Sequence, residues 1–206
     1  MLGSSAVGYA ANMKTDCGSA SDEDDMGRIG ILHKCRVEGV GVVRASGEYR
    51  LVAIRPITAV ERLFAIEGEL ANRPSRYSVQ IGVNLHIDLG SGHSAEEILD
   101  RYFWRFMNHS CDPNALIRGR EVIAWRDIEP WEAVTFNYNT TEWDMAEPFT
   151  CRCGSPDCLG TIRGFKHLTP TQRKRLGVVA PHLGHHLLGE PPVTGMTVLA
   201  AELSGV

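Results

Sequence analysis

Three cysteines lie close together in the segment CRCGSPDC. Cys151 and Cys153 have one residue between them, and Cys158 follows five residues after Cys153. Thiolates at this spacing can reach one ion from a single loop, where they supply three of the four ligands of a tetrahedral zinc ion. The alternative, a group of unrelated buried or surface thiols, is disfavoured by the tight spacing. We therefore expect this loop to bind zinc.

The fourth ligand must come from another part of the chain. The candidates are several histidines and Cys17, Cys35 and Cys111. Cys111 is the best placed, because it stands in the polar turn NHSCDPN, whose side chains can bond backbone groups. A site closed by four thiolates is structural and would order a loop that has little core of its own. The predicted zinc ligands are Cys111, Cys151, Cys153 and Cys158.

Three segments follow one another in the second half of the chain: RFMNHSCDPN, WEAVTFNYN and CRCGSPDC. Together they resemble the SET-domain lysine methyltransferases that carry a post-SET zinc loop. The upstream Gly39-Val40-Gly41 is similar to the Gly-x-Gly cofactor turn of that family. The resemblance spans roughly residues 30–168, with no pre-SET cysteine cluster before it, as in a minimal, bacterial-type member. It implies a mostly β fold, the β-clip SET domain, with several small sheets, few short helices and a C-terminal pseudoknot.

The resemblance also implies an activity. The cofactor would be S-adenosylmethionine, and the acceptor a lysine side-chain amine of a histone or other protein. Tyr138, in the segment TFNYN, matches the family's catalytic tyrosine and would orient the amine. Phe136 matches a position that holds Tyr or Phe in the family, and Phe leaves room for a di- or trimethylated product. Taken by itself, Phe136 is equally compatible with an ordinary core position.

Cofactor contacts follow from the same resemblance. Asn108 would bond the amino-acid end of the cofactor, and the backbone around His109 would meet the adenine. Without the neighbouring motifs, a lone histidine such as His109 would more often be a packing residue. The predicted cofactor-binding residues are Gly39, Val40, Gly41, Tyr77, Asn108, His109, Phe149 and Arg152.

Lysine methylation sets a simple chemical requirement. The nucleophile must be a neutral amine, whereas a free lysine has a pKa of about 10.4 and is protonated at neutral pH. Burial in a narrow apolar channel and a nearby positive sulfonium both favour the neutral amine. The protein then has mainly to align the reactants and exclude water.

Short β-rich segments must position these residues. RYSVQIGVNLHIDL is predicted to form a hairpin, and ALIRG with REVIAWRDI two strands around a turn at Gly119. HSAEEILDRYFWRF is predicted to form one helix, with Ser94 as its cap and Glu97 at the capping-box position. TPTQRKRL is predicted to form a second, short helix. The absence of a β-α-β rhythm excludes a doubly wound nucleotide-binding sheet as the leading idea.

The expected organisation has four parts: a mobile leader at 1–28, the SET domain at 29–139, the post-SET zinc loop at 140–168 and a C-terminal extension at 169–206.

A net charge of −4 gives no sign of a protein built to coat nucleic acid. No apolar run is long enough for a membrane span, and no secretory signal begins the chain. Zinc-binding thiols indicate an intracellular, reducing compartment.

Two other functions remain open. A non-catalytic SET module would bind peptides without methylating them, although the presence of Tyr138, Asn108 and His109 argues against this. A thiol enzyme would use Cys111 with His109. A further metal site has its only support in the spacing of three histidines, which are more often packing or surface residues: His182, His185 and His186.

Overall fold

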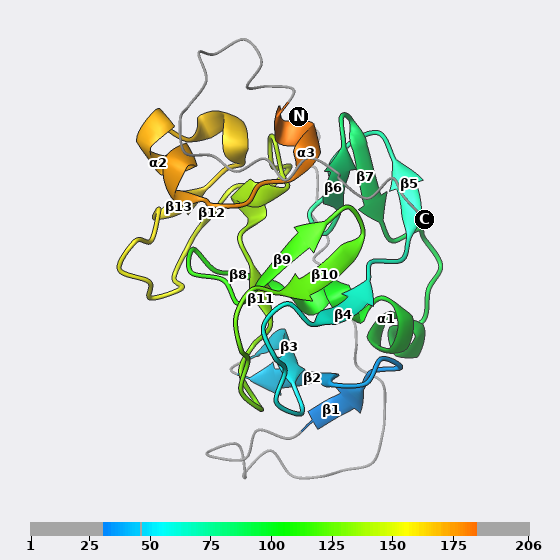
Figure 1. The fold of residues 1–206 in the computed structure, drawn as a ribbon. Helices are drawn as coiled ribbons and strands as arrows, with labels where there is room; N and C mark the ends of the chain where they lie inside the picture. The colour runs from blue at the N-terminus through cyan, green and yellow to red at the C-terminus, as the bar shows by residue number, and fades with distance from the viewer. Residues whose placement is uncertain (1–30, 46, 185–206) are drawn as a thin grey trace, which may run out of the picture.

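The computed structural model describes residues 31–45 and 47–184. The predicted leader, Cys17, His185 and His186 lie outside these residues, as does most of the predicted C-terminal extension. The described part consists of small sheets joined by short helices and irregular segments, so the predicted mostly β fold is confirmed (Figure 1). None of the described helices has both the length and the hydrophobicity of a bilayer-spanning helix.

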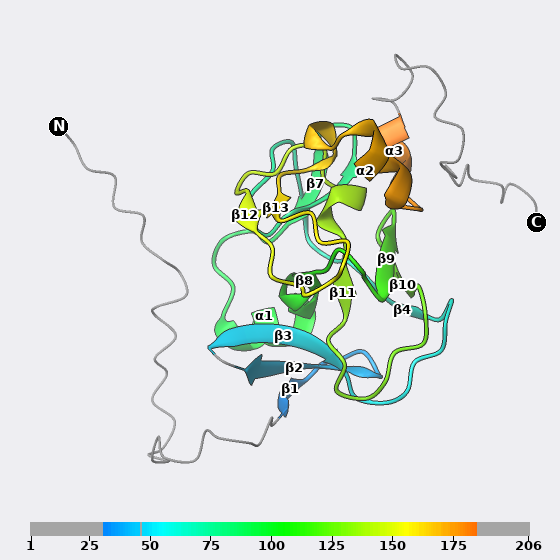
Figure 2. The same ribbon diagram turned by 90° about the vertical axis from the view of Figure 1, so that its left-hand side faces the viewer.

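The N-terminal sheet forms a separate layer below the other sheets (Figures 1 and 2). Its antiparallel strands are β1 (Ile31–Lys34), β2 (Val40–Ala45) and β3 (Glu48–Ala53), with β2 in the middle. The β-branched residues of β2 are buried, because this central strand is covered by the core. The backbone of β3 also bonds the segment before β11, since Val134 N–H donates to Leu51 O at 2.8 Å.

Two further three-stranded sheets stand above it. One contains β4 (Arg62–Ala65), β9 (Ala115–Arg118) and β10 (Glu121–Ala124), with β10 in the middle. The other contains β5 (Glu69–Ala71), β6 (Val79–Gly82) and β7 (Leu85–Asp88), with β7 in the middle. The predicted hairpin β6–β7 and the predicted turn at Gly119 between β9 and β10 are confirmed. Gly119 has a φ of 61°, a backbone conformation that glycine adopts without a steric penalty.

Only the first half of the long predicted helix is α-helical. Helix α1 (Ala95–Arg101) begins as expected, with the Ser94 hydroxyl accepting from Glu97 N–H at 3.1 Å. The chain then continues as the 3₁₀ turn η1 (Phe103–Phe106), so a single helix was a wrong prediction. Trp104 is 2 % exposed and donates its indole N–H to Glu67 O at 2.8 Å. The tighter turn thus brings Trp104 into the core with its polar atom bonded.

The site is organised by two short parallel strands, β8 (Asn108–His109) and β11 (Thr135–Phe136). The predicted strand TFNYN ends at Phe136 and turns into η2 (Tyr138–Thr140). Asn114 fixes this arrangement, because its Oδ1 accepts from Thr135 N–H and its Nδ2 donates to Ala133 O, both at 2.8 Å. The expected pseudoknot would bring the segments of β8 and β11 side by side, as they are in this pairing.

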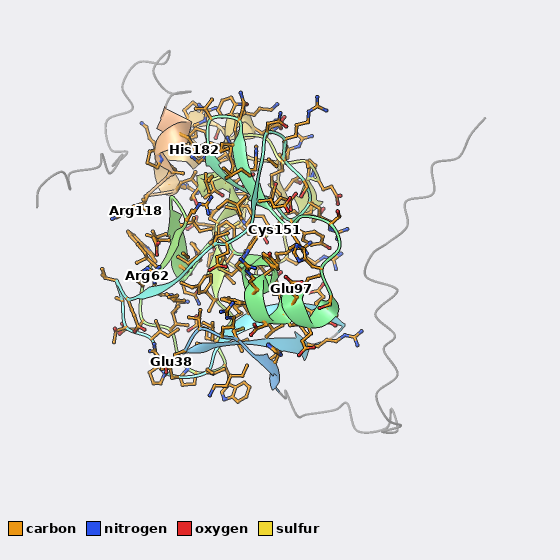
Figure 3. All side chains as sticks on the ribbon, turned by 90° about the vertical axis from the view of Figure 1, so that its right-hand side faces the viewer. Glu38, Arg62, Glu97, Arg118, Cys151 and His182 are labelled. Carbon is orange, nitrogen blue, oxygen red and sulfur yellow. The ribbon has the colours of Figure 1, made fainter. Side chains whose placement is uncertain are left out.

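The C-terminal part packs above the site and has a small core of its own. Its elements are β12 (Phe149–Thr150), β13 (Thr161–Ile162), η3 (Phe165–His167), α2 (Pro170–Arg175) and α3 (Pro181–Gly184). The predicted helix at α2 is confirmed, with a full capping box between Thr169 and Gln172. His182, labelled on α3 in Figure 3, bonds Thr141 O at 2.7 Å and so ties α3 to the segment after η2.

Candidate functional site

The structure brings four cysteines to one point. The sulfur atoms of Cys111, Cys151, Cys153 and Cys158 all lie within 4.8 Å of one another. Cys111 follows β8 and Cys151 follows β12, while the other two lie in the irregular loop before β13. A tetrahedral zinc ion with bonds of about 2.3 Å needs sulfurs about 3.8 Å apart, so this donor set fits zinc with little adjustment.

The thiol cluster needs a cation to ionise fully. Burial raises the pKa of the Cys111 thiol, and it raises that of Cys151 to about 11. Burial also acts to raise the pKa of Cys153, but hydrogen bonds from the backbone at Cys111 and Ser155 bring it down to about 6. A bound metal would ionise the remaining thiols, because a coordinating thiol is deprotonated.

Cys35 is buried in the main core and is not part of the cluster.

His109 links this cluster to Tyr138. Tyr138 N–H donates to His109 Nδ1 at 3.1 Å, and His109 Nε2 lies 3.3 Å from the sulfur of Cys111. Burial lowers the pKa of His109 to about 4, so the imidazole is neutral at neutral pH. Since Nδ1 accepts a hydrogen bond, the proton is on Nε2 and points at the sulfur. His109 therefore holds the metal-binding turn against the backbone of Tyr138.

Tyr138 is held by aromatic contacts and by one hydrogen bond. Its hydroxyl donates to Met107 O at 2.9 Å. Its ring lies 4.6 Å from that of Phe136, 5.2 Å from that of His109 and 5.9 Å from that of Phe149, measured between centroids. Burial raises the pKa of the phenol, with a smaller contribution from the charge of Glu142. The hydroxyl is therefore protonated at neutral pH, and its proton is donated to Met107 O.

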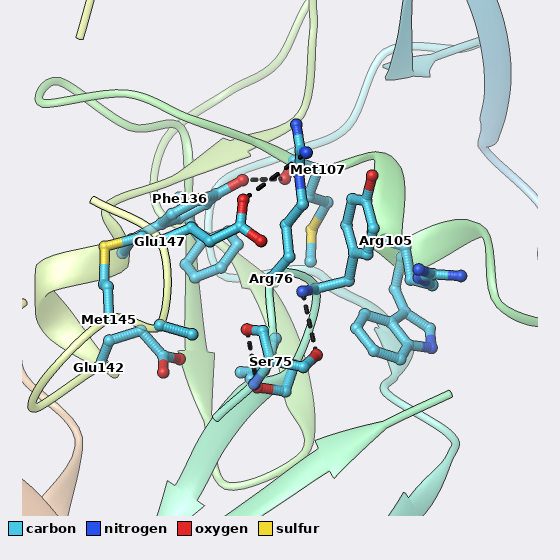
Figure 4. A pocket seen from close by; sticks show the side chains of 14 residues that line it. Ser75, Arg76, Arg105, Met107, Phe136, Glu142, Met145 and Glu147 are labelled. Atoms are coloured by element: carbon cyan, nitrogen blue, oxygen red, sulfur yellow. Dashed lines mark hydrogen bonds and ion pairs between the residues drawn. The ribbon is translucent and has the colours of Figure 1, made fainter. Parts of the chain in front are cut away.

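Tyr138 is one of the residues that line a narrow cavity. Figure 4 shows the side chains around this cavity. Its volume is about 50 Å³, comparable to that of about two water molecules. Its walls are mainly apolar and include Val79, Trp104, Met107 and Phe136. Such walls can contact the end of an alkyl chain.

Tyr138 also lines a second, wider cavity of about 680 Å³. This volume is within the size range of cofactor sites. Five of the predicted cofactor residues line it: Tyr77, Asn108, His109, Phe149 and Arg152. The Asn108 side chain is partly engaged, because its Nδ2 donates to Tyr49 O at 3.2 Å.

The two cavities share a wall. The residues that line both are Arg76, Tyr77, Arg105, Tyr138, Met145 and Glu147. Tyr138 thus lines both cavities, while Phe136 lines only the narrow one. This arrangement allows two molecules to enter separately and to meet at Tyr138.

Arg105, in the shared wall, is a functional candidate that the sequence prediction missed. Arg105 lies 4.2 Å above the ring centroid of Tyr77, and burial lowers its guanidinium pKa. In the described structure its Nε is buried and has no hydrogen-bond partner. Arg76 pairs with Glu147 at 3.6 Å. A buried guanidinium with a free donor can receive an anionic group of a ligand. The only sequence signal for Arg105 was its place at the start of RFMNHSCDPN.

The predicted cofactor turn consists of Gly39, Val40 and Gly41, and its contact with the cofactor stays a prediction. None of the three lines either cavity. Gly39 has a φ of 94°, and a side chain there would come within 2.9 Å of Arg55 Nε. Val40 is 1 % exposed and packs in the core. These residues shape the start of β2, whereas Glu48 and Arg50 of β3 reach the wide cavity.

Comparison with known proteins gives the family context. The SET domain family model matches residues 48–139. Methyltransferase flvH of Aspergillus flavus is 35% identical over 117 residues, which cover 55% of this chain and 59% of that protein. A histone-lysine N-methyltransferase of Cryptococcus neoformans, H3 lysine-36 specific, is 41% identical over 68 residues, which cover 29% of this chain and 8% of that protein. The histone-lysine N-methyltransferase ash1 of Drosophila melanogaster is 38% identical over the same length and is covered to 3%.

Among solved structures, KRYPTONITE in complex with mCHG DNA and SAH matches with a TM-score of 0.46 and 22% identity. The match covers 62% of this chain and 29% of that one. The chain thus spans 59% of the length of flvH and a much smaller share of the histone-lysine relatives.

Proposed function

We propose that this chain, whose residues 48–139 match the SET domain family model, is an S-adenosylmethionine-dependent protein-lysine N-methyltransferase. The observation that carries the proposal is the position of Tyr138 in a wall shared by a narrow and a wide cavity. A methyl transfer needs this geometry, because donor and acceptor must meet in line while water is kept out.

The wide cavity is the proposed cofactor site. When bound, S-adenosylmethionine supplies an electrophilic methyl group on a positively charged sulfur. Arg105 and the amide of Asn108 would hold its amino-acid end, since guanidinium and amide groups bond a carboxylate well. Phe149 and Arg152 would cover the adenine, because both present flat faces to an aromatic ring.

The narrow cavity is the proposed lysine channel. Its apolar walls would contact the methylene groups of the lysine side chain. The Tyr138 hydroxyl and Met107 O lie 2.9 Å apart, so a carbonyl acceptor stands next to the phenol. Together they would orient the amine nitrogen toward the wide cavity. Phe136 brings no hydroxyl into the channel, which leaves room for a di- or trimethylated product.

Zinc would hold the two sides of the site together. The four cysteines fit the ion, and His109 connects Cys111 to Tyr138. We therefore assign zinc a structural role and place the protein in a reducing compartment, where the thiols stay available for metal.

A histone lysine is the first substrate to test, because two of the relatives above are named histone-lysine N-methyltransferases. The test incubates the purified full chain with tritiated S-adenosylmethionine and, separately, histone H3, a mixed protein extract and free lysine. Label on protein lysine supports the proposal, and mass spectrometry then gives the number of methyl groups. Cofactor binding without any transfer would favour the alternative, a non-catalytic peptide-binding SET module. Transfer only to free lysine would restrict the activity to small amines.

A further inference from the structure

The narrow cavity contains a carboxylate that the proposed reaction has not used. Glu142 lines this cavity and is 6 % exposed. It follows η2, and its N–H donates to Tyr138 O at 2.9 Å, so the fold keeps it one turn after Tyr138. Figure 4 shows its carboxylate turned toward the space that the lining side chains enclose.

One oxygen of this carboxylate is bonded by the protein and the other is not. Oε1 accepts from Gln80 N–H at 2.7 Å and from the Thr141 hydroxyl at 3.2 Å. Within the described residues, Oε2 accepts no hydrogen bond and no cation pairs with Glu142. The carboxylate is thus fixed in position with one oxygen available to a ligand.

The other charged groups of the cavity do not pair with Glu142. Arg76 pairs with Glu147 at 3.6 Å, and Arg105 stacks on the ring of Tyr77. Neither arginine makes an ion pair with Glu142. A buried carboxylate without a cation is costly, and a positively charged ligand would offset that cost. Burial raises the pKa of Glu142 to about 7, which agrees with a missing counter-charge.

We propose that Glu142 is the specificity-determining residue that receives the substrate's primary ammonium group in the narrow cavity. The inference rests on the proposed function for the identity of that amine as a lysine. The carboxylate oxygen Oε2 accepts a hydrogen bond from the ammonium as the substrate enters, while the apolar walls contact the alkyl chain. The amine must then lose one proton before its nitrogen can accept a methyl group. The same cavity discriminates against neutral chains of equal length, since these leave the buried carboxylate without a partner.

The test uses n-butylammonium, which has the end of a lysine side chain, and 1-butanol as a neutral probe. Both are titrated into full chain labelled with ¹³C at the methionine methyl groups. Met107 and Met145 both line the cavity and serve as reporters. We expect n-butylammonium to shift both signals in the wild type and to bind about tenfold more weakly to Glu142→Gln. The affinity for 1-butanol is expected to be similar in the two proteins.

Two further variants separate recognition from structure. Glu142→Asp keeps the charge but shortens the side chain, whereas Glu142→Gln keeps the length and the acceptor for Gln80 N–H. Recognition by charge predicts that Asp retains more ammonium binding than Gln, and a purely structural role predicts the reverse. Glu147→Gln removes a charge that Arg76 already neutralises, so its effect should be smaller than that of Glu142→Gln.

The proposal is overturned if n-butylammonium leaves Met107 and Met145 unshifted in the wild type, or if it binds wild type and Glu142→Gln equally. The methylation assay is separate from this one. Ammonium binding without methyl transfer would refute the proposed function alone. Methyl transfer at the wild-type rate and substrate KM in Glu142→Gln would refute this inference alone.

Discussion

Replacing Glu142 by Gln should make the protein more stable at alkaline pH. The carboxyl group is buried, and burial raises its pKa from 4.5 to about 7 in the folded state. Each pKa unit corresponds to about 1.4 kcal/mol, so ionisation of Glu142 costs the folded state about 3 kcal/mol relative to the unfolded chain. Gln has nearly the same shape and carries no charge, which removes this cost.

The pH range follows from the direction of the shift. Below about pH 4.5 the carboxyl is protonated in both states, and Glu142 contributes no pH dependence. Between about pH 4.5 and 7 the unfolded chain loses its proton first, so the stability of the wild type falls relative to that of Glu142→Gln. Above about pH 7 the difference should be constant. The facing groups Tyr138, Arg76, Arg105 and Glu147 are common to both proteins, so their own titration largely cancels in the difference.

Urea unfolding followed by tryptophan fluorescence at several pH values between 5 and 8 gives the free energy of unfolding of both proteins. We expect the variant to gain about 2.5 kcal/mol over the wild type between the two ends of this range. A difference between the two proteins that does not change with pH would refute the assignment of a buried, uncompensated carboxylate. The same substitution is expected to weaken ammonium binding, so a gain in stability accompanies a loss of function.

Three other perturbations test the site. Cys153→Ser should no longer bind one zinc ion per chain, as measured by plasma mass spectrometry, whereas Cys35→Ala, outside the cluster, should still bind it. Zinc retained by Cys153→Ser would contradict the assigned ligand set. Asn114→Ala removes the hydrogen bonds to Thr135 N–H and Ala133 O and should lower the free energy of unfolding in urea by about 2 to 3 kcal/mol. The control Asn72→Ala, at an exposed position, should lower it by less than about 0.5 kcal/mol. Equal losses in the two variants would contradict the role of Asn114 in holding β11. Phe136→Tyr should shift the product toward monomethyl-lysine in mass spectra, and an unchanged product distribution would contradict its role in the channel.

Local sequence patterns predicted the elements that depend on local physics. The hairpin β6–β7 and the strands around Gly119 follow alternation and turn residues, and α2 follows its capping box. The cysteine spacing also predicted the cluster, because three ligands come from one loop. The single long helix before the site was wrong, since burial of Trp104 and its bond to Glu67 O favour a 3₁₀ turn over continued helix.

The functional residues that were missed depend on contacts between distant segments. Gly39-Val40-Gly41 has the composition of a cofactor turn, but it lines neither cavity, so its contact with the cofactor stays a prediction. Glu142 is part of an irregular segment whose hydrophobic residues show no helical or strand periodicity. Its burial depends on Gln80, which lies on β6 and is 62 residues away in the chain. Pairings of this kind cannot be read from spacing along one segment.

The central claim is that Tyr138 aligns donor and acceptor where the two cavities meet. The most direct measurement compares single-turnover methyl transfer by wild type and Tyr138→Phe, with the Kd for S-adenosylmethionine determined by calorimetry on the same samples. We predict that transfer slows by about a hundredfold while the Kd changes less than about threefold. Transfer at the wild-type rate by Tyr138→Phe would contradict the account.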